Sequence, residues 1–202
     1  MKTSVVVLVG IILWCVACST QPDGQIEPSA GGTPKIIFDT DMGPDYDDIG
    51  AITVLHALAD SGQCEILATV ASDTHPSIAP TIEVFNRYFG RDSLPVGAAP
   101  QGAPDFTAEN DWNDTLINMY APDLWDKSYP DAVNVYRQVL AGQPDHSVTV
   151  VTVGFLSNLS ALLDSQPDAY SELNGVDLVK AKVKQLVAMA GAFPEGSEGV
   201  RI

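Results

Sequence analysis

The feature that most constrains the fold of this chain is the stretch Lys35–Ala51, KIIFDTDMGPDYDDIGA, where a short apolar run leads directly into five aspartates. The apolar run does not alternate with polar residues, which is typical of a strand buried on both faces of a sheet. In residues 47–62, apolar side chains recur at helical spacing and Gly62 supplies a stop signal. The stretch therefore predicts a buried strand, an acidic loop and a helix in immediate succession.

The alternation of strand and helix patterns continues along the chain, except in residues 98–130, which contain Pro and Trp and show no clear period. Alternating strands and helices indicate an α/β fold with an open, mainly parallel, Rossmann-like sheet that is flanked by helices. Further strands are expected at residues 65–72, 94–97, 147–154 and 183–191, and further helices at residues 79–90, 131–142 and 156–165.

The N-terminus has the pattern of a secretory signal, with Lys2 at the start and an apolar core at Val5–Trp14. This core is shorter than the roughly 20 residues that a membrane-spanning helix needs. Small residues lead to Cys18 as at the end of a bacterial lipobox, although Cys15 replaces the usual Leu, so an ordinary cleaved signal is the alternative. We expect a signal peptide at 1–17, a lipidated Cys18, a flexible tether rich in Pro, Gly and Ser at 18–34, and a folded domain at 35–202.

These N-terminal features predict an exported protein that is lipid-anchored in the bacterial cell envelope. Ser19, directly after the proposed lipid site, favours the periplasmic face of the outer membrane. The charge of the chain also restricts its partners, because 26 acidic and 10 basic residues give a net charge of −16. Nucleic acid is therefore not an expected partner, since phosphate contacts need Lys and Arg.

The aspartates themselves predict a binding site. In an open parallel sheet, ligands bind beyond the carboxyl ends of the strands, and Asp39 ends the first strand while Asp41–Asp48 form the loop after it. Several carboxylates in one crevice either have raised pKa values or bind a cation, and hard oxygen ligands select Ca²⁺ or Mg²⁺. Helix capping by Asp47 or Asp48 is the simpler alternative, but it explains only one or two of the five aspartates.

Two known aspartate motifs fit the stretch less well. An EF-hand would need a glutamate at the twelfth position from Asp39, where Gly50 is found, and a helix rather than a strand before the loop. A phosphatase of the haloacid dehalogenase type matches IIFDTDMG as far as the Asp-x-Asp pair. It fails at Gly43, where that motif has Thr or Val.

The stretch most resembles the inosine/uridine-preferring nucleoside hydrolase family, whose signature is an apolar strand followed by Asp-x-Asp-x-Gly-x-Asp-Asp, in some members with two extra residues before the last pair. VTVVTVGFLSNLSALL, at 148–163, is similar to the strand and Gly-x-Leu-Thr-Asn-Leu turn of that family. VKQLVAMAGAFPEG, at 183–196, is similar to its Val-x-Met-Gly-Gly strand end. The resemblance runs from about Lys35 to about Glu198 in the order of the family.

The resemblance implies a Ca²⁺ site and a ribose site. In the family, the residue at Asp41 binds Ca²⁺ and is the catalytic base for water attack, while the residue at Asp48 chelates the ion and the carbonyl at Val153 completes part of the coordination. The family places a ribose contact at Asp47 and another near Asp73, and the residue at Asp39 orders the loop. The implied reaction is hydrolysis of the N-glycosidic bond of a ribonucleoside through an oxocarbenium-like state, giving ribose and base.

The chain departs from the family at its C-terminal end. Where the family has a Glu-Phe-Asn segment, Gly199 and Val200 follow Glu198, and the later His-Asp pair has no counterpart in the sequence. We therefore expect the hydrolase domain to be incomplete, with its C-terminal part missing. Two interpretations follow, a nucleoside hydrolase or a noncatalytic sugar- or cation-binding lipoprotein. Because the family commonly forms dimers or tetramers, a homo-oligomer is also to be considered.

Overall fold

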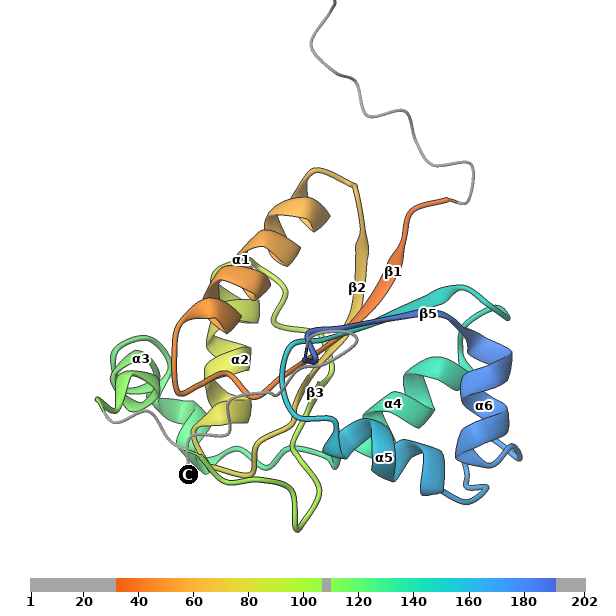
Figure 1. Cartoon of the computed structure of the whole chain (residues 1–202). Helices are drawn as coiled ribbons and strands as arrows, with labels where there is room; N and C mark the ends of the chain where they lie inside the picture. Colours follow the sequence, from red (N-terminus) through yellow and green to blue (C-terminus); the bar gives the residue numbers. More distant parts are fainter. Residues whose placement is uncertain (1–31, 107–109, 192–202) are drawn as a thin grey trace, which may run out of the picture. The chain divides into compact units, whose positions relative to one another are not determined.

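The computed structural model of the protein describes residues 32–106 and 110–191. Within these residues, five strands form one sheet in the order β3-β2-β1-β4-β5, and each neighbouring pair is parallel. The predicted open, parallel α/β fold is thereby confirmed (Figure 1). The strands are β1 Lys35–Thr40, β2 Glu65–Ala71, β3 Val96–Gly97, β4 Val148–Thr152 and β5 Val183–Ala188. The helices are α1 Asp47–Asp60, α2 Ile78–Tyr88, α3 Trp112–Tyr120, α4 Ala132–Ala141, α5 Ser157–Asp164 and α6 Gly175–Lys182, with a 3₁₀ helix η1 at Pro122–Asp126.

The central strand β1 explains why its sequence shows no polar alternation. Ile36 and Phe38 pack into a hydrophobic cluster with α1 and α2, whereas Ile37 packs into a second cluster with α4, α5 and α6. Successive side chains of a strand point to opposite faces, so both sets must be apolar when helices cover both faces. The two helical layers lie on opposite sides of the sheet in Figure 1.

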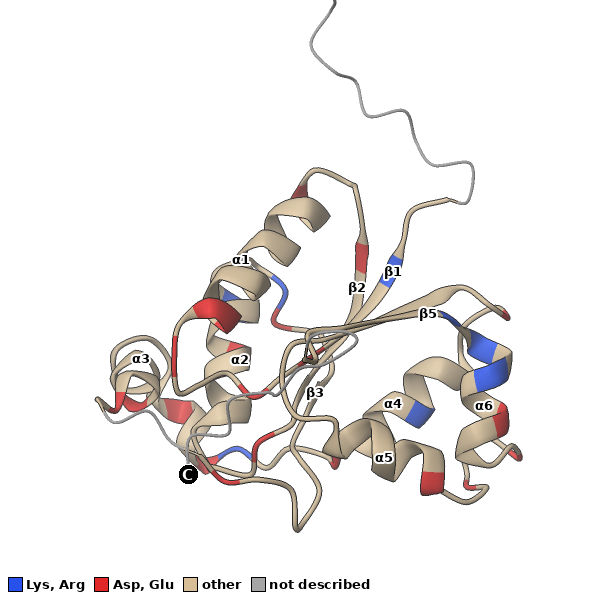
Figure 2. Ribbon diagram, in the orientation of Figure 1, with Lys and Arg blue, Asp and Glu red and all other residues tan. Residues whose placement is uncertain are grey.

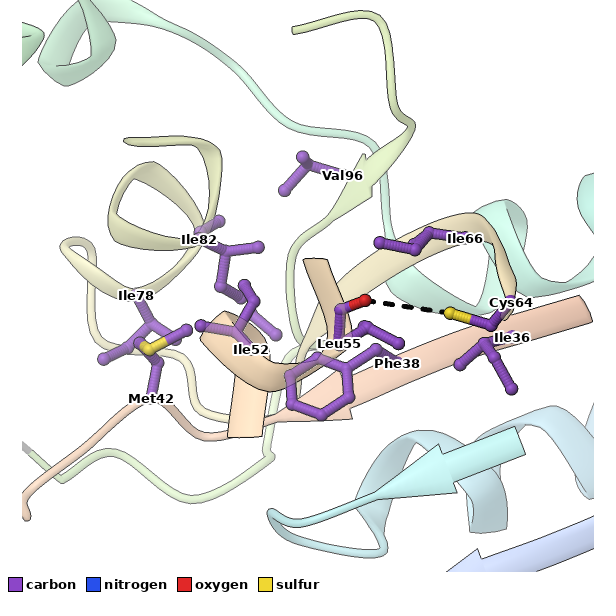
Figure 3. Packing of buried hydrophobic residues seen from close by; sticks show 12 residues of the cluster. Ile36, Phe38, Met42, Ile52, Leu55, Cys64, Ile66, Ile78, Ile82 and Val96 are labelled. Carbon is purple, nitrogen blue, oxygen red and sulfur yellow. Dashed lines mark hydrogen bonds between the residues drawn. The ribbon is translucent and has the colours of Figure 1, made fainter. Parts of the chain in front are cut away.

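The first layer also buries part of the acidic loop. Met42, which lies among the aspartates, is wholly buried in the cluster that contains Ile52 of α1 and Ile78 and Ile82 of α2 (Figure 3). Burial of a methionine side chain stabilises a fold by about 1.5–3 kcal/mol. Met42 therefore anchors the loop to the hydrophobic core between its charged residues.

The second layer is held by a buried arginine as well as by apolar packing. Arg137 of α4 is 2% exposed, and its guanidinium donates hydrogen bonds to both carboxylate oxygens of Asp168, to the Ser165 hydroxyl and to two backbone carbonyls. The hydrogen bonds from Arg137 hold the pKa of Asp168 at about 2. A buried guanidinium needs such complete pairing, so α4 is fixed to the segment that follows α5.

Three elements were not expected from the sequence, namely α3 and η1 within residues 98–130 and α6 before the last strand. The predicted lipidation site Cys18 and most of the tether lie outside the described residues, so they remain predictions. No helix in the part of the chain that the structure describes is long and apolar enough to cross a membrane.

Candidate functional site

The connection from β1 to α1 gathers the aspartates at the carboxyl end of the central strand. Asp39 is the penultimate residue of β1, Asp41 follows the strand, and Asp47 and Asp48 form the first turn of α1. Figure 2 shows acidic residues succeeding one another along this connection. β1 lies between β2 and β4 and is parallel to both. The segments that follow β2 and β4 therefore begin at the same end of the sheet as the acidic loop.

Asp39 is completely buried and is bound from the second helical layer. The Tyr136 hydroxyl of α4 donates to its Oδ2 at 2.8 Å, and the Asn158 amide of α5 donates to both oxygens at 3.2–3.3 Å. Burial raises the pKa of Asp39 to about 7, although hydrogen bonds from Tyr136, Asn158 and Ser72 act to lower it. Asp39 therefore serves as a fixed structural acceptor that is closed off from solvent.

Thr40 joins the strand, the loop and the helix through one hydroxyl group. Its Oγ1 accepts a hydrogen bond from the Met42 backbone N–H at 3.0 Å and donates one to Asp48 Oδ1. Asp48 is 3% exposed, so its carboxylate faces the interior of the loop rather than solvent. Neither Asp47 nor Asp48 caps α1, because the N-cap residue is Tyr46 and no side chain there accepts a capping hydrogen bond.

Burial, and to a lesser extent mutual repulsion, disfavours the charged form of the carboxylates at this end of the sheet. Burial, followed by the charge and hydrogen bond of Asp48 and the charge of Asp73, raises the pKa of Asp41 to about 8. Burial also raises the pKa of Asp48 to about 6 against the Thr40 hydrogen bond, with contributions from Asp47 and Asp45. A positive charge placed among these groups would reverse the shifts, so the site is electrostatically suited to a cation or a cationic transition state.

The donors present are suitable for a hard metal ion. Oxygens of Asp45, Asp47 and Asp48 lie within 4.8 Å of one another, and Asp41 makes a hydrogen bond with Asp48. Ca²⁺ takes about six to eight oxygen ligands at about 2.3–2.6 Å, and Mg²⁺ about six at shorter distances. An all-oxygen set of this kind could hold either ion. Asp48 belongs both to the cluster with Asp45 and Asp47 and to the pair with Asp41.

The turn after β4 packs directly against the acidic loop. The Val153 backbone N–H donates to the Asp39 carbonyl at 2.9 Å, and a Cβ added to Gly154 would lie 2.3 Å from the Asp41 nitrogen and from Ser72 Oγ. Any side chain at 154 would push this turn away from the loop. A glycine is therefore required at 154 for this turn to approach the Asp41 backbone as closely as it does.

Asp73 lies after β2 and is 2% exposed. Its two carboxylate oxygens accept hydrogen bonds from the backbone N–H groups of His75 and Phe106, each at 2.7 Å. Burial raises the pKa of Asp73 despite these two hydrogen bonds. The residue is thereby fixed beside Asp41, whose pKa its charge affects.

The structure thus brings together Asp39, Asp41, Asp47, Asp48, Asp73 and Val153, whereas the roles assigned to them remain predictions. The residues that hold these groups were not singled out from the sequence. Thr40 lies inside the motif and Asn158 inside the second matching segment, so motif position could have indicated both. Tyr136 and Ser72 lie in no such segment, and only the fold brings them to Asp39. Glu198 lies outside the described residues.

A family model described as inosine-uridine preferring nucleoside hydrolase matches residues 36–198. The chain therefore belongs to that family, as its motifs predicted. Among curated protein sequences, none matches the chain significantly.

Several solved structures have a fold similar to that of this chain. The plant nucleoside hydrolase PpNRh1 is 23% identical over 79% of this chain and 48% of its own, with a TM-score of 0.55. The effector protein XOO4466 and the type III effector protein XopQ, the latter complexed with adenosine diphosphate ribose, are each 20% identical over 81% of this chain, with TM-scores of 0.62. The matches cover 45% and 46% of those two proteins, so this chain spans about half the length of the structures it resembles.

Replacing Gly154 by alanine should disrupt the contact between the β4 turn and the acidic loop. Because the new Cβ would overlap the Asp41 backbone, we expect a loss of unfolding free energy of roughly 1–3 kcal/mol, measured by urea denaturation. Gly142→Ala is the matched control, since a Cβ there would have its nearest neighbour at 3.6 Å. Equal stability of the two variants would contradict the close contact between Gly154 and the Asp41 backbone.

The stability of the metal-free protein should depend on the ionisation of Asp41. The pKa of its carboxyl is about 8 in the folded protein against 3.8 for the unfolded chain, so ionisation costs folding free energy increasingly as the pH rises from about 4 to about 8. Asp41→Asn removes this cost, and its stability relative to wild type should rise by on the order of 2 kcal/mol over that range.

Thermal unfolding in the presence of a chelator, repeated across this pH range, measures the effect. Asp164→Asn, at the exposed end of α5, provides the control for loss of one negative charge. A constant difference between Asp41→Asn and wild type at every pH would contradict the prediction.

Proposed function

We propose that this protein hydrolyses the N-glycosidic bond of a ribonucleoside to ribose and a free base, with Ca²⁺ as its cofactor. The observation that carries the proposal is the cluster of Asp41, Asp48 and Asp73 at the carboxyl end of the sheet, in a chain of the nucleoside hydrolase family. A ribosyl group that develops positive charge would be favoured by carboxylates at this position.

Asp41, Asp48 and the backbone carbonyl of Val153 are the proposed ligands of the ion. The raised pKa values of both carboxyls support this assignment, because such groups become more stable when a cation joins them. When bound, Ca²⁺ would favour the charged carboxylates and make water at the site easier to deprotonate.

The remaining chemistry falls to the side chains of the chain. Asp41, whose charged form a bound cation would favour, accepts the proton of the attacking water as general base. Asp47 and Asp73 accept hydrogen bonds from ribose hydroxyl groups and orient the sugar. Asp39, enclosed by Tyr136 and Asn158, keeps the loop in place without touching substrate.

The decisive measurement is release of reducing sugar from inosine and uridine by the purified full chain, with Ca²⁺ and with a chelator. Asp41→Ala should lower the rate at least about 100-fold, because a general base contributes roughly that much or more. Asp164→Ala is the control and should retain the wild-type rate. Adenosine diphosphate ribose belongs among the substrates tested, since one structural neighbour was solved with it.

The other outcomes separate the alternatives. Ca²⁺ binding by wild type without turnover of any substrate would refute the hydrolase and support a noncatalytic sugar- or cation-binding protein. Release of phosphate from p-nitrophenyl phosphate with Mg²⁺, lost in Asp39→Ala, would instead support a phosphatase.

The signal-like N-terminus supports a location for this activity in the bacterial cell envelope, with the chain attached to the membrane by a lipid on Cys18. Substitution of Cys18 by serine should abolish labelling of the protein by radioactive palmitate in growing cells. Cys64→Ser is the matched control and should label as wild type does, because Cys64 is buried in the folded domain. Unlabelled wild-type protein would rule out the anchor.

A further inference from the structure

The start of α3 contacts the acidic loop at two of its residues, Met42 and Tyr46. The Asn113 side-chain amide donates to the Met42 carbonyl at 3.0 Å, next to Asp41. The Trp112 ring packs against the Tyr46 ring with centroids 5.9 Å apart, next to Asp47. Asn110 adds a hydrogen bond of 2.6 Å from its amide to the Tyr46 hydroxyl. A segment some 70 residues away in sequence is thus bound to the loop at Met42 and Tyr46, two points that lie between Asp41 and Asp47.

The loop needs such support because its backbone is strained at Met42. Met42 has φ of 49°, in the left-handed region that is sterically unfavourable for a residue other than glycine. Two hydrogen bonds hold it there, since its N–H donates to Thr40 Oγ1 and its carbonyl accepts from Asn113. Thr40 belongs to the motif, but Asn113 is supplied from outside it.

α3 is itself fixed to the rest of the fold. Ile117 and Ala121 form a small buried cluster with Leu124 and with Val84 of α2. The Asn113 amide also reaches Thr81 Oγ1 of α2 at 3.3 Å, and Asn113 is 2% exposed. The contact from Asn113 to the loop therefore comes from a buried side chain on a packed helix.

We propose that α3 clamps the acidic loop, with Asn113 and Trp112 as positioning residues that hold Asp41–Asp48 in the geometry that binds the ion and the ribose. The role of the clamp in ion and ribose binding rests on the proposed function. The contacts between α3 and the loop do not depend on that function. Displacements of about 1 Å at a site can cost roughly 100-fold in rate, so a loop of mutually repelling carboxylates gains much from being held.

The clamp can be tested without any metal through the fluorescence of Trp112. The chain has three tryptophans, so replacing Trp14 and Trp125 by phenylalanine leaves Trp112 as the only one. In this background and with a chelator present, Asn113→Ala should shift Trp112 emission to the red and increase its quenching by acrylamide. Asn118→Ala on the same helix is the control, because its partner Trp125 has already been replaced.

The second measurement is Ca²⁺ affinity, by calorimetric titration of the full chain well below its unfolding temperature. Asn113→Ala should bind Ca²⁺ about tenfold more weakly than wild type and Asn118→Ala, because a buried hydrogen bond to the loop is lost. A residue that merely stabilised α3 would lower the unfolding temperature and leave this affinity unchanged. Should Asn113→Ala not fold, Tyr46→Leu at an exposed position removes the other half of the clamp and should shift both readouts in the same direction.

Unchanged Trp112 quenching and unchanged Ca²⁺ affinity in the variants would overturn the clamp. If wild type itself binds no Ca²⁺, the proposed function loses its cofactor, and the quenching comparison alone then decides whether α3 holds the loop. The two failures are therefore distinguishable.

Discussion

A carboxylate buried at the end of the central strand is the interaction on which the site depends. Asp39 has no access to water, and an unpaired buried charge or polar group would cost several kcal/mol. Tyr136 and Asn158 satisfy it, and both come from helices of the layer opposite α1 and α2. The packing of that layer therefore holds the Asp39 side chain in place directly before the acidic loop.

The loop is then held from several directions against the repulsion of its own charges. Thr40 links its backbone to Asp48, Met42 fixes it in the core, and the close approach of Gly154 sets its distance from the β4 turn. The start of α3 contacts it at Met42 and Tyr46. This arrangement keeps carboxylates with raised pKa values close together, which makes the region attractive to positive charge.

The sheet was predictable mainly from its central strand β1, which is buried on both faces and therefore reads as a continuous apolar run. The helices α1, α2 and α4 were predictable from their apolar spacing. In contrast, α6 begins with Gly175, a poor helix former, and has only eight residues, so local pattern carries little information about it. The helix α3 has only two buried residues, Asn113 and Ile117, and its position depends on packing against α2.

The sequence by itself determined the class of fold, the family, and the identity of the acidic residues, because these follow from apolar periodicity and from the order and spacing of motifs along the chain. Only the tertiary structure decided which groups hold those residues. Tyr136 and Asn158 are 97 and 119 residues from Asp39, and Asn113 is 71 residues from Met42. Such contacts arise from how helices pack on the two faces of the sheet, and no local pattern encodes them because each depends on the position of the whole helix that carries it.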